Sequence, residues 1–280
     1  DNVTITGSTA ARGGGIYVYN LDGGLNISNS TISNNTAINY SNFGGNGGGI
    51  SVRDTDVNIT GVVMHSNAIT GSNVSISMFG GAIYSYNNNL TIDKSTISNN
   101  SNSDDNGGGI FDEGGSTVII TNSTIHGNSA NNGNGGGVYL KSGTNTITNT
   151  TIFNNTSKNF GGGVYLSGTT YLTNVTIANN DRQGTLGADG LHSGSSAGNL
   201  YVKNTLIANN DAEDYSHLYG GGAPTDNGYN LVENSESYDW EGTGDIIGDQ
   251  EDLNLSASLA DNATLNGTQT LALSAGSVAI

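Results

Sequence analysis

The chain has no cysteine, a single proline, and charged residues at only 11% of its 280 positions. Without cysteine, disulfide bonds and thiolate metal sites are excluded. Soluble domains usually carry about a quarter of charged residues, so Gly, Asn, Ser and Thr must supply most of this surface. No run of about 18 apolar residues occurs, which leaves no candidate for a membrane-spanning helix. The sequence therefore predicts a protein without a transmembrane segment.

Basic residues are scarcer still. Lys and Arg together number 7 against 24 Asp and Glu, which gives a net charge of −17. Such a surface repels the phosphate backbone of nucleic acids, and no basic stripe offsets the repulsion. We therefore expect no nucleic-acid partner.

The sequence does contain a repeat, which residues 122–166 show twice: Thr-Ile-x-x-Asn alternates with Gly-Gly-Gly-Val-Tyr-Leu. The two phrases recur at steps of roughly 25 to 34 residues. Steps of this size are typical of a stacked solenoid. Regularly placed Ile, Val and Leu in each repeat argue against a disordered chain. We therefore expect an ordered, all-β repeat protein.

The first phrase places an asparagine three residues after an apolar residue in seven copies. Asn tolerates the left-handed conformation of a tight corner, and stacked amides can hydrogen-bond from coil to coil. We predict a structural ladder, with a row of ligand-binding amides as the alternative. The predicted ladder residues are Asn35, Asn67, Asn100, Asn128, Asn155, Asn180 and Asn210.

The glycine triplets and a third apolar pair complete the repeat. Glycine permits sharp bends where backbones crowd, and pairs such as Leu25 with Ile27 have strand spacing. The five-residue step from Ile27 to Ile32 breaks this parity and predicts a corner near residues 28–30. We predict a right-handed parallel β-helix with three short strands per coil and about eight to ten coils. Residues 1–223 would form the repeats, and residues 224–280 divergent coils and a cap of the same solenoid.

One column of aromatic residues is predicted to point outward. In Ile16-Tyr17-Val18 the apolar pair faces inward, so Tyr17 faces outward. Since coils stack about 4.8 Å apart, equivalent rings would form an exposed ladder that contacts glycans or a neighbouring rod. The alternative is that the stacked rings only reinforce coil pairing. The column comprises Tyr17, Tyr84, Phe111, Tyr139 and Tyr165.

The repeats resemble those of polymorphic outer-membrane proteins and related microbial surface β-helices. Residues 205–280 resemble the end of the choice-of-anchor family of extracellular right-handed β-helix proteins. The matching segments are TLIANN at 205–210, GYNLV at 228–232, GDIIG at 244–248 and LADNATLNGTQTLALSAGSVAI at 259–280. The resemblance implies a secreted or cell-surface rod used in adhesion or surface structure.

The alternative function is that of a polysaccharide lyase or glycoside hydrolase of the pectate-lyase-like β-helix type. Such enzymes need a base or paired carboxylates. Of the candidate carboxylates, Asp104-Asp105 is expected in a loop and Asp112-Glu113 after a strand. Asp189-Gly190-Leu191-His192 resembles a fragment of a sugar-hydrolase motif, but it occupies the position of a drifted glycine triplet. The four histidines show no metal spacing. We therefore expect no catalysis.

Three further expectations concern ions, glycans and ends. Ca²⁺ could bind acidic corners, formed by Asp211, Glu213 and Asp214 and by Asp245, Asp249, Glu251 and Asp252. No other cofactor is expected. Sequons occur at Asn39, Asn73, Asn262 and Asn266, which makes them possible glycosylation sites. Strand edges at the ends of a solenoid can pair, so copies of the chain joined end to end, or surface glycans, are the expected partners.

Overall fold

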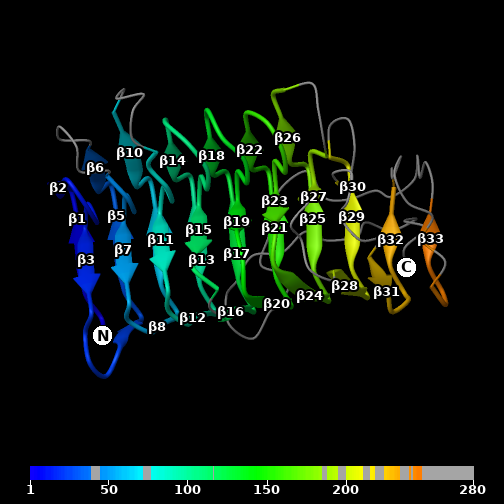
Figure 1. Cartoon of the computed structure of the whole chain (residues 1–280), viewed down its shortest axis with the longest axis horizontal. Coiled ribbons are helices and arrows are strands. Elements are labelled where there is room, and N and C mark those ends of the chain that lie inside the picture. The colour runs from blue at the N-terminus through cyan, green and yellow to red at the C-terminus, as the bar shows by residue number, and fades with distance from the viewer. Residues whose placement is uncertain are drawn as a thin grey trace.

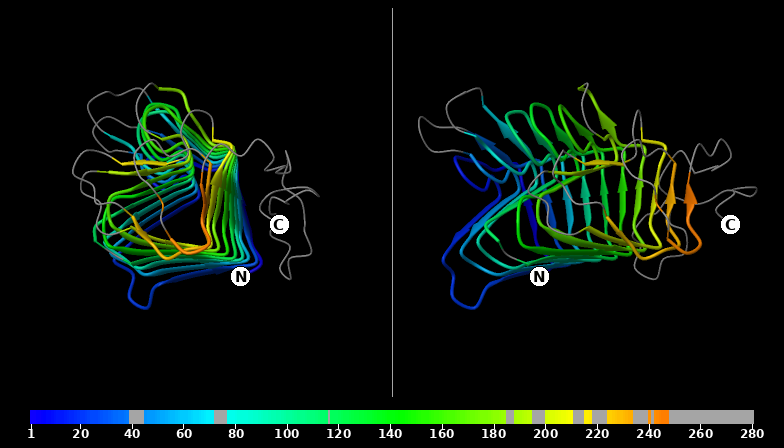
Figure 2. Two further views of the ribbon diagram at one scale, coloured as in Figure 1. Left: turned by 90° about the vertical axis from the view of Figure 1, so that its right-hand side faces the viewer. Right: turned by 45° about the vertical axis from the view of Figure 1, so that its right-hand side comes forward.

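The computed structural model describes residues 1–38, 45–71, 77–115, 117–184, 188–194, 200–210, 215–217, 224–233, 240 and 242–247. In these residues the chain winds as a solenoid whose strands form four parallel sheets, here called A to D. Seen along its axis, one coil lies behind another (Figure 2, left). Sheet B runs along one long edge of the rod and sheet D along the opposite edge (Figure 1).

Each strand pairs with its equivalent on the next coil, and the strands of each sheet follow in spatial order. Sheet A contains β1 (Thr4–Thr6), β5 (Thr31–Ser33), β9 (Val63–His65), β13 (Thr96–Ser98), β17 (Thr124–His126), β21 (Thr151–Phe153), β25 (Thr176–Ala178), β29 (Leu206–Ala208), β32 (Leu231–Val232) and β33 (Ile246–Ile247). Sheet B contains β2 (Thr9–Ala10), β6 (Thr36–Ile38), β10 (Ala68–Thr70), β14 (Ser101–Asn102), β18 (Ser129–Ala130), β22 (Thr156–Ser157) and β26 (Asp181–Arg182). Sheet C contains β3 (Ile16–Tyr19), β7 (Ile50–Arg53), β11 (Ile83–Tyr86), β15 (Ile110–Glu113), β19 (Val138–Leu140), β23 (Val164–Leu166), β27 (Leu191–Ser193) and β30 (Tyr215–His217). Sheet D contains β4 (Leu25–Ser28), β8 (Val57–Thr60), β12 (Leu90–Asp93), β16 (Thr117–Thr121), β20 (Thr144–Thr148), β24 (Thr169–Thr173), β28 (Leu200–Lys203) and β31 (Thr225–Asp226).

The prediction of three strands per coil is wrong, because a complete coil has four. The additional strands are those of sheet B, two or three residues long, and all but β2 directly follow a ladder asparagine. So short a strand shows no alternation in the sequence, and its residues read as the start of a variable loop. Along the described chain, seven turns carry a strand in all four sheets, and sheet A extends to ten strands.

The core is a stack of identical positions in register. The inward residues of sheet A are Ile32, Met64, Ile97, Ile125, Ile152, Ile177 and Ile207, all fully buried. Burying each such side chain contributes about 1.5 to 3 kcal/mol. Beyond sheet C, the ring of Trp240 packs edge-on against Tyr215 at 5.6 Å and continues this core.

The corner predicted near residues 28–30 is confirmed, since Asn29 has a φ of 47° and joins sheet D to sheet A. Strands β31 to β33, after Pro224, continue sheets D and A. The boundary between repeats and a cap at residues 223 and 224 stays a prediction, and residues 251–280 lie outside the described part of the chain.

Candidate functional site

The predicted asparagine ladder runs through the interior, where each side-chain amide bonds to the next. Asn128 Nδ2 donates to Asn155 Oδ1 at 2.9 Å, and Asn155 Nδ2 donates to Asn180 Oδ1 at 3.0 Å. The same Oδ1 atoms accept the backbone N–H of the preceding ladder residue. The second hydrogen of Asn155 Nδ2 reaches the carbonyl oxygen of Ile125 at 3.0 Å. These amides are engaged inside the protein, so the ligand-binding alternative has no accessible groups at Asn128 or Asn155, both 0% exposed.

The ladder residues do not take the left-handed conformation that the sequence suggested for them. That conformation belongs to the residue immediately before, for example Asn34 (φ 54°) before Asn35 and Asn154 (φ 52°) before Asn155. The chain turns sharply at the first residue, and the turn directs the second side chain inward.

Four of the five aromatic residues predicted to be exposed are buried, so this part of the prediction is wrong. Their exposed fractions are 4% for Tyr84, 1% for Phe111, 9% for Tyr139 and 9% for Tyr165. The rings do stack, with centroids 4.9 Å apart for Phe111 and Tyr139 and 4.5 Å apart for Tyr139 and Tyr165. Only Tyr17, at 43%, is exposed. The column therefore acts as a second apolar cluster on the outside of sheet C.

The cover comes from rings that precede glycine triplets and fold back over sheet C. Phe79 stacks on Phe111 at 4.3 Å, and Phe160 lies 4.6 Å from the ring of His192. Burial raises the pKa of Tyr84 to about 12, with Glu113 as the next contributor. Burial likewise raises the pKa of Tyr139, and the neighbouring Tyr165 adds to the rise.

Exposed tyrosines and half-buried arginines lie at the first three strands of sheet C. Tyr19 is 62% exposed and pairs in register with Arg53, which in turn pairs with Tyr86. The Arg53 guanidinium lies 4.6 Å from the centroid of the Tyr86 ring, a cation–π contact. The Arg12 guanidinium lies 5.9 Å from that of Tyr17. Two of the three arginines of this acidic chain thus lie beside tyrosines, Arg12 beside the exposed Tyr17 and Arg53 beside the half-buried Tyr86.

A surface cleft adjoins these residues at the corner between sheets C and D. Its volume is about 630 Å³. The lining includes Leu21, Asp22, Asp54, Asp56, Asn58 and Asn87. Sequence reasoning did not predict this cleft, because its residues come from three coils of different loop length.

Sheet D carries another exposed aromatic contact. The rings of Tyr171 and Tyr201 stack with centroids 4.6 Å apart and planes within 5°. Tyr171 is 41% exposed. Thr169 and Thr173 lie on the same strand, β24, and point to the same side as Tyr171, so this face presents hydroxyl groups.

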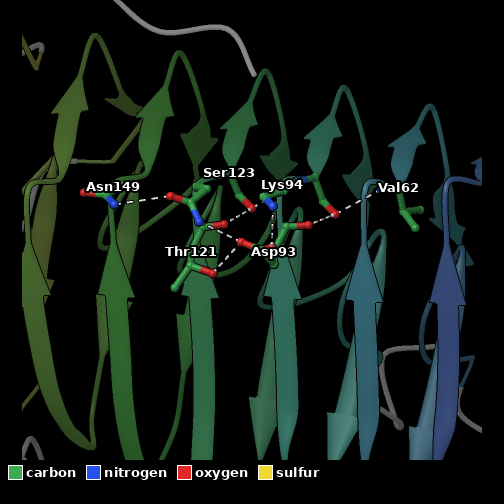
Figure 3. Close-up of polar contacts among 8 residues, drawn as sticks. Val62, Asp93, Lys94, Thr121, Ser123 and Asn149 are labelled. Carbon is green, nitrogen blue, oxygen red and sulfur yellow. Dashed lines mark hydrogen bonds and ion pairs between the residues drawn. The ribbon is translucent and has the colours of Figure 1, made fainter. Parts of the chain in front are cut away.

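A second amide ladder follows the outside of the corner between sheets D and A (Figure 3). Asn149 Nδ2 donates to Asn122 Oδ1 at 3.2 Å, and Asn174 Nδ2 donates to Asn149 Oδ1 at 2.9 Å. Asp93 ends this series by accepting from Thr121 Oγ1 and Asn122 Nδ2, each at 2.8 Å. The sequence signal was present, since each of these asparagines stands three residues before an inward isoleucine.

The carboxylates considered for catalysis are separated. Asp112 points into the solenoid and is fully buried, and burial raises its pKa to about 6. Its register neighbour Ser85 lowers the pKa and offsets part of that rise. The Ser85 hydroxyl also donates to Asn88 Oδ1 at 2.7 Å. Glu113 faces outward and forms an ion pair with Lys141. Asp104 has a raised pKa from burial and from the adjacent Asp105.

Asp189 does occupy the position of a triplet glycine, as the register of the repeat predicted. Its carboxylate is 3.3 Å from Arg182 Nε in an ion pair whose side chains are 8% (Arg182) and 0% (Asp189) exposed. The sequence did not predict this pair. His192 joins the aromatic column, 5.3 Å from the ring of Tyr165.

Of the predicted calcium-binding corners, only Asp245 lies in the described residues. Its pKa is raised by burial and by a hydrogen bond with Asp226, which accepts the N–H groups of Gly228 and Gly242, each at 2.8 Å. Within the described ranges, no group of three or more His, Cys, Asp or Glu is placed to hold a metal ion. The other corner residues, Asp211, Glu213, Asp214, Asp249, Glu251 and Asp252, and the sequons Asn39, Asn73, Asn262 and Asn266 lie outside the described residues.

Comparison with known protein families identifies the class. Residues 1–185 match the model of the right-handed β-helix region. The match covers more than half of the chain, which therefore belongs to the right-handed β-helix family. No curated protein and no solved structure matched the chain. In the described part of the chain, no helix has the length and apolar character needed to cross a membrane.

Proposed function

We propose that this chain is a non-catalytic structural and adhesive rod of a microbial cell surface. The observation that carries the proposal is the unbroken inner ladder from Asn35 to Asn210, in which every turn is bonded to the next by buried amides. Buried hydrogen-bond chains of this kind rigidify a fold. A stiff rod suits a protein that holds contact surfaces in fixed positions.

The resemblance supports an extracellular location, and the charge argues against a nucleic-acid partner. The net charge of −17 favours a soluble surface that repels nucleic acid. The repeats and residues 205–280 resemble microbial surface β-helices, whose role is adhesion or surface structure.

The test displays the chain on a non-adherent cell and measures retention on glycan-coated and cell-coated surfaces under flow. Retention above that of an undisplayed control is expected. In parallel, the purified chain is incubated with neutral and acidic polysaccharides, and new reducing ends or unsaturated products are measured. Reproducible product formation would overturn the proposal that the chain is non-catalytic. Absence of retention would overturn the proposal that it is adhesive.

The alternative is a polysaccharide lyase or glycoside hydrolase. The observation that favours it is the base–carboxylate pair of Arg182 and Asp189. Both side chains are almost fully buried, which argues for a structural ion pair that a polysaccharide does not reach. If products form, and if Arg182→Lys abolishes their formation while the variant keeps its fold, the enzyme alternative is supported.

Head-to-tail assembly is a further element of the proposal. On the first turn Ile5, Ile16 and Leu25 are only partly buried, whereas their equivalents on the third turn, Met64, Ile83 and Leu90, are buried. The strands of this turn have a paired neighbour on one side only. Stacking of a further coil or of another copy would bury these side chains and pair these strands. Electron microscopy should show fibres much longer than one rod; isolated short rods would exclude this assembly.

A further inference from the structure

The cleft between sheets C and D has the size and polarity of a site for a small polar ligand. Its volume of about 630 Å³ lies in the range of small-molecule sites, roughly 300 to 1,000 Å³. Carboxylates and amides from three successive turns line it, among them Asp22, Asp54, Asp56 and Asn87.

The polar groups of the cleft are held in place by bonds between turns. Asp54 Oδ1 accepts from Asn87 Nδ2 at 2.6 Å. Asp56 Oδ1 accepts from the backbone N and from Nδ2 of Asn89 at 2.9 and 3.2 Å. In each carboxylate one oxygen is fixed by the neighbouring turn, and no hydrogen bond to Oδ2 occurs among the described residues. Acceptors fixed in advance lose little entropy when a ligand binds.

Two tyrosines and an arginine precede residues of the cleft along the chain. Tyr19, Arg53 and Tyr86 end their strands on sheet C, and the cleft-lining residues Leu21, Asp54 and Asn87 follow within two positions. Tyr19 is largely exposed, and Arg53 is stacked over Tyr86. The lining therefore combines hydrogen-bond acceptors with the exposed apolar side chain of Leu21, and the exposed Tyr19 lies two residues before Leu21.

This combination fits a neutral saccharide. Sugar hydroxyls donate to carboxylate and amide oxygens, and the C–H face of a sugar ring packs on an aromatic ring. Three aspartates disfavour an anionic ligand. A metal ion is disfavoured because Asn87 and Asn89 already occupy one oxygen of Asp54 and one of Asp56.

We propose that this cleft binds a neutral saccharide, with Asp22, Asp54 and Asp56 accepting from its hydroxyls and the exposed Tyr19 packing against a sugar ring. The inference rests on the proposed adhesive function in that it names the site and the class of ligand through which adhesion would occur. The cleft is a different site from the aromatic column of sheet C, most of which is buried.

The experiment titrates the full chain with neutral oligosaccharides of glucose, mannose, galactose and xylose, with oligogalacturonate and with an oligolysine peptide. Binding is followed by calorimetry and by saturation-transfer NMR. Tyr19→Ala and Asp22→Asn alter exposed side chains, so both variants should fold. Each is expected to weaken binding of a neutral oligosaccharide by about tenfold, the scale of one lost contact worth about 1.4 kcal/mol. The matched control is Tyr171→Ala on sheet D, which should bind as the unaltered chain does.

Three results would overturn the inference: no binding of any neutral saccharide, unchanged affinity in both cleft variants, or a preference for oligogalacturonate or oligolysine. Failure of this site is distinguishable from failure of the proposed function. If the double variant Tyr19→Ala/Asp22→Asn still adheres under flow, the rod is adhesive through another face and only this site is wrong. If the unaltered chain binds saccharide in solution but does not adhere, the adhesive function is wrong and the site stands.

Discussion

Gly137 lies against the side-chain amide of Asn155 on the next turn. A Cβ atom built on Gly137 would come within 3.0 Å of both Cγ and Nδ2 of Asn155. Gly163 has the same relationship to Asn180, at 2.9 Å. The two phrases of the repeat therefore depend on each other, because the third glycine of the triplet leaves room for the ladder amide.

The buried ladder should be essential for stability. Asn155→Ala leaves the backbone N–H and Nδ2 of Asn128 and the carbonyl of Ile125 without their partner. Buried polar groups without partners are costly, so the free energy of unfolding should fall by about 2 to 4 kcal/mol. Urea unfolding followed by circular dichroism measures the change.

Asn58→Ala is the matched control, because Asn58 Nδ2 also donates to an asparagine, Asn26 Oδ1 at 3.0 Å, but on the exposed face of sheet D. Its cost should stay within about 0.5 kcal/mol. Equal losses in the two variants would contradict a special role for the buried ladder.

The second and third glycines of a triplet should differ in tolerance. A Cβ on Gly136 would lie 2.2 Å from the carbonyl oxygen of Thr156 and 2.3 Å from that of Gly162, two backbones that cannot move aside. At the third position the protein itself has Ala82 in one repeat. Gly136→Ala should therefore destabilise by at least about 1 to 3 kcal/mol, and Gly137→Ala by less. Thermal unfolding of both variants tests the order, and the reverse order would contradict it.

Asp112 should make stability depend on pH. Its pKa is about 6 in the folded protein and 3.8 in the reference state, so the folded chain binds more protons between these values. The contribution of this group to stability is then greatest at low pH and is lost as pH rises through about 6, by roughly 3 kcal/mol. Asp112→Asn should remove this loss and raise the free energy of unfolding at about pH 8.

Urea unfolding at a series of pH values measures this effect. Glu113→Gln, which alters the adjacent outward carboxylate, should keep most of the pH dependence. If Asp112→Asn instead lowers stability equally at low and high pH, the carboxyl group is not the source.

The aromatic column should stabilise the rod where it is covered. Phe111→Ala removes a buried ring stacked on Phe79 and Tyr139 and should cost about 3 to 5 kcal/mol. Tyr17→Ala, in the same column but exposed, should cost less than about 1 kcal/mol. Urea midpoints compare the two variants. A similar small loss for both would mean that the rings are exposed after all.

The repeat determined much of this structure by itself. Because parallel coils stack in register, a residue that recurs at the same position meets its own copy on the next turn. The ladder from Asn35 to Asn210 and the inward isoleucines could thus be predicted without coordinates. The corner at Asn29 followed from a break in strand parity, for the same reason.

The tertiary structure alone decided which columns are covered. Sheet B is built from two- and three-residue strands without a sequence signal. The chain passes through this sheet before it comes back to sheet C, where Phe79 and Phe160 cover the aromatic column. The pairing of Arg182 with Asp189 and the cleft beside Tyr19 depend on loops that differ from turn to turn. The register of the coils determines which residues a side chain meets on the two adjacent turns. Whether a loop covers that side chain depends on the length and path of the loop, which the repeat does not encode.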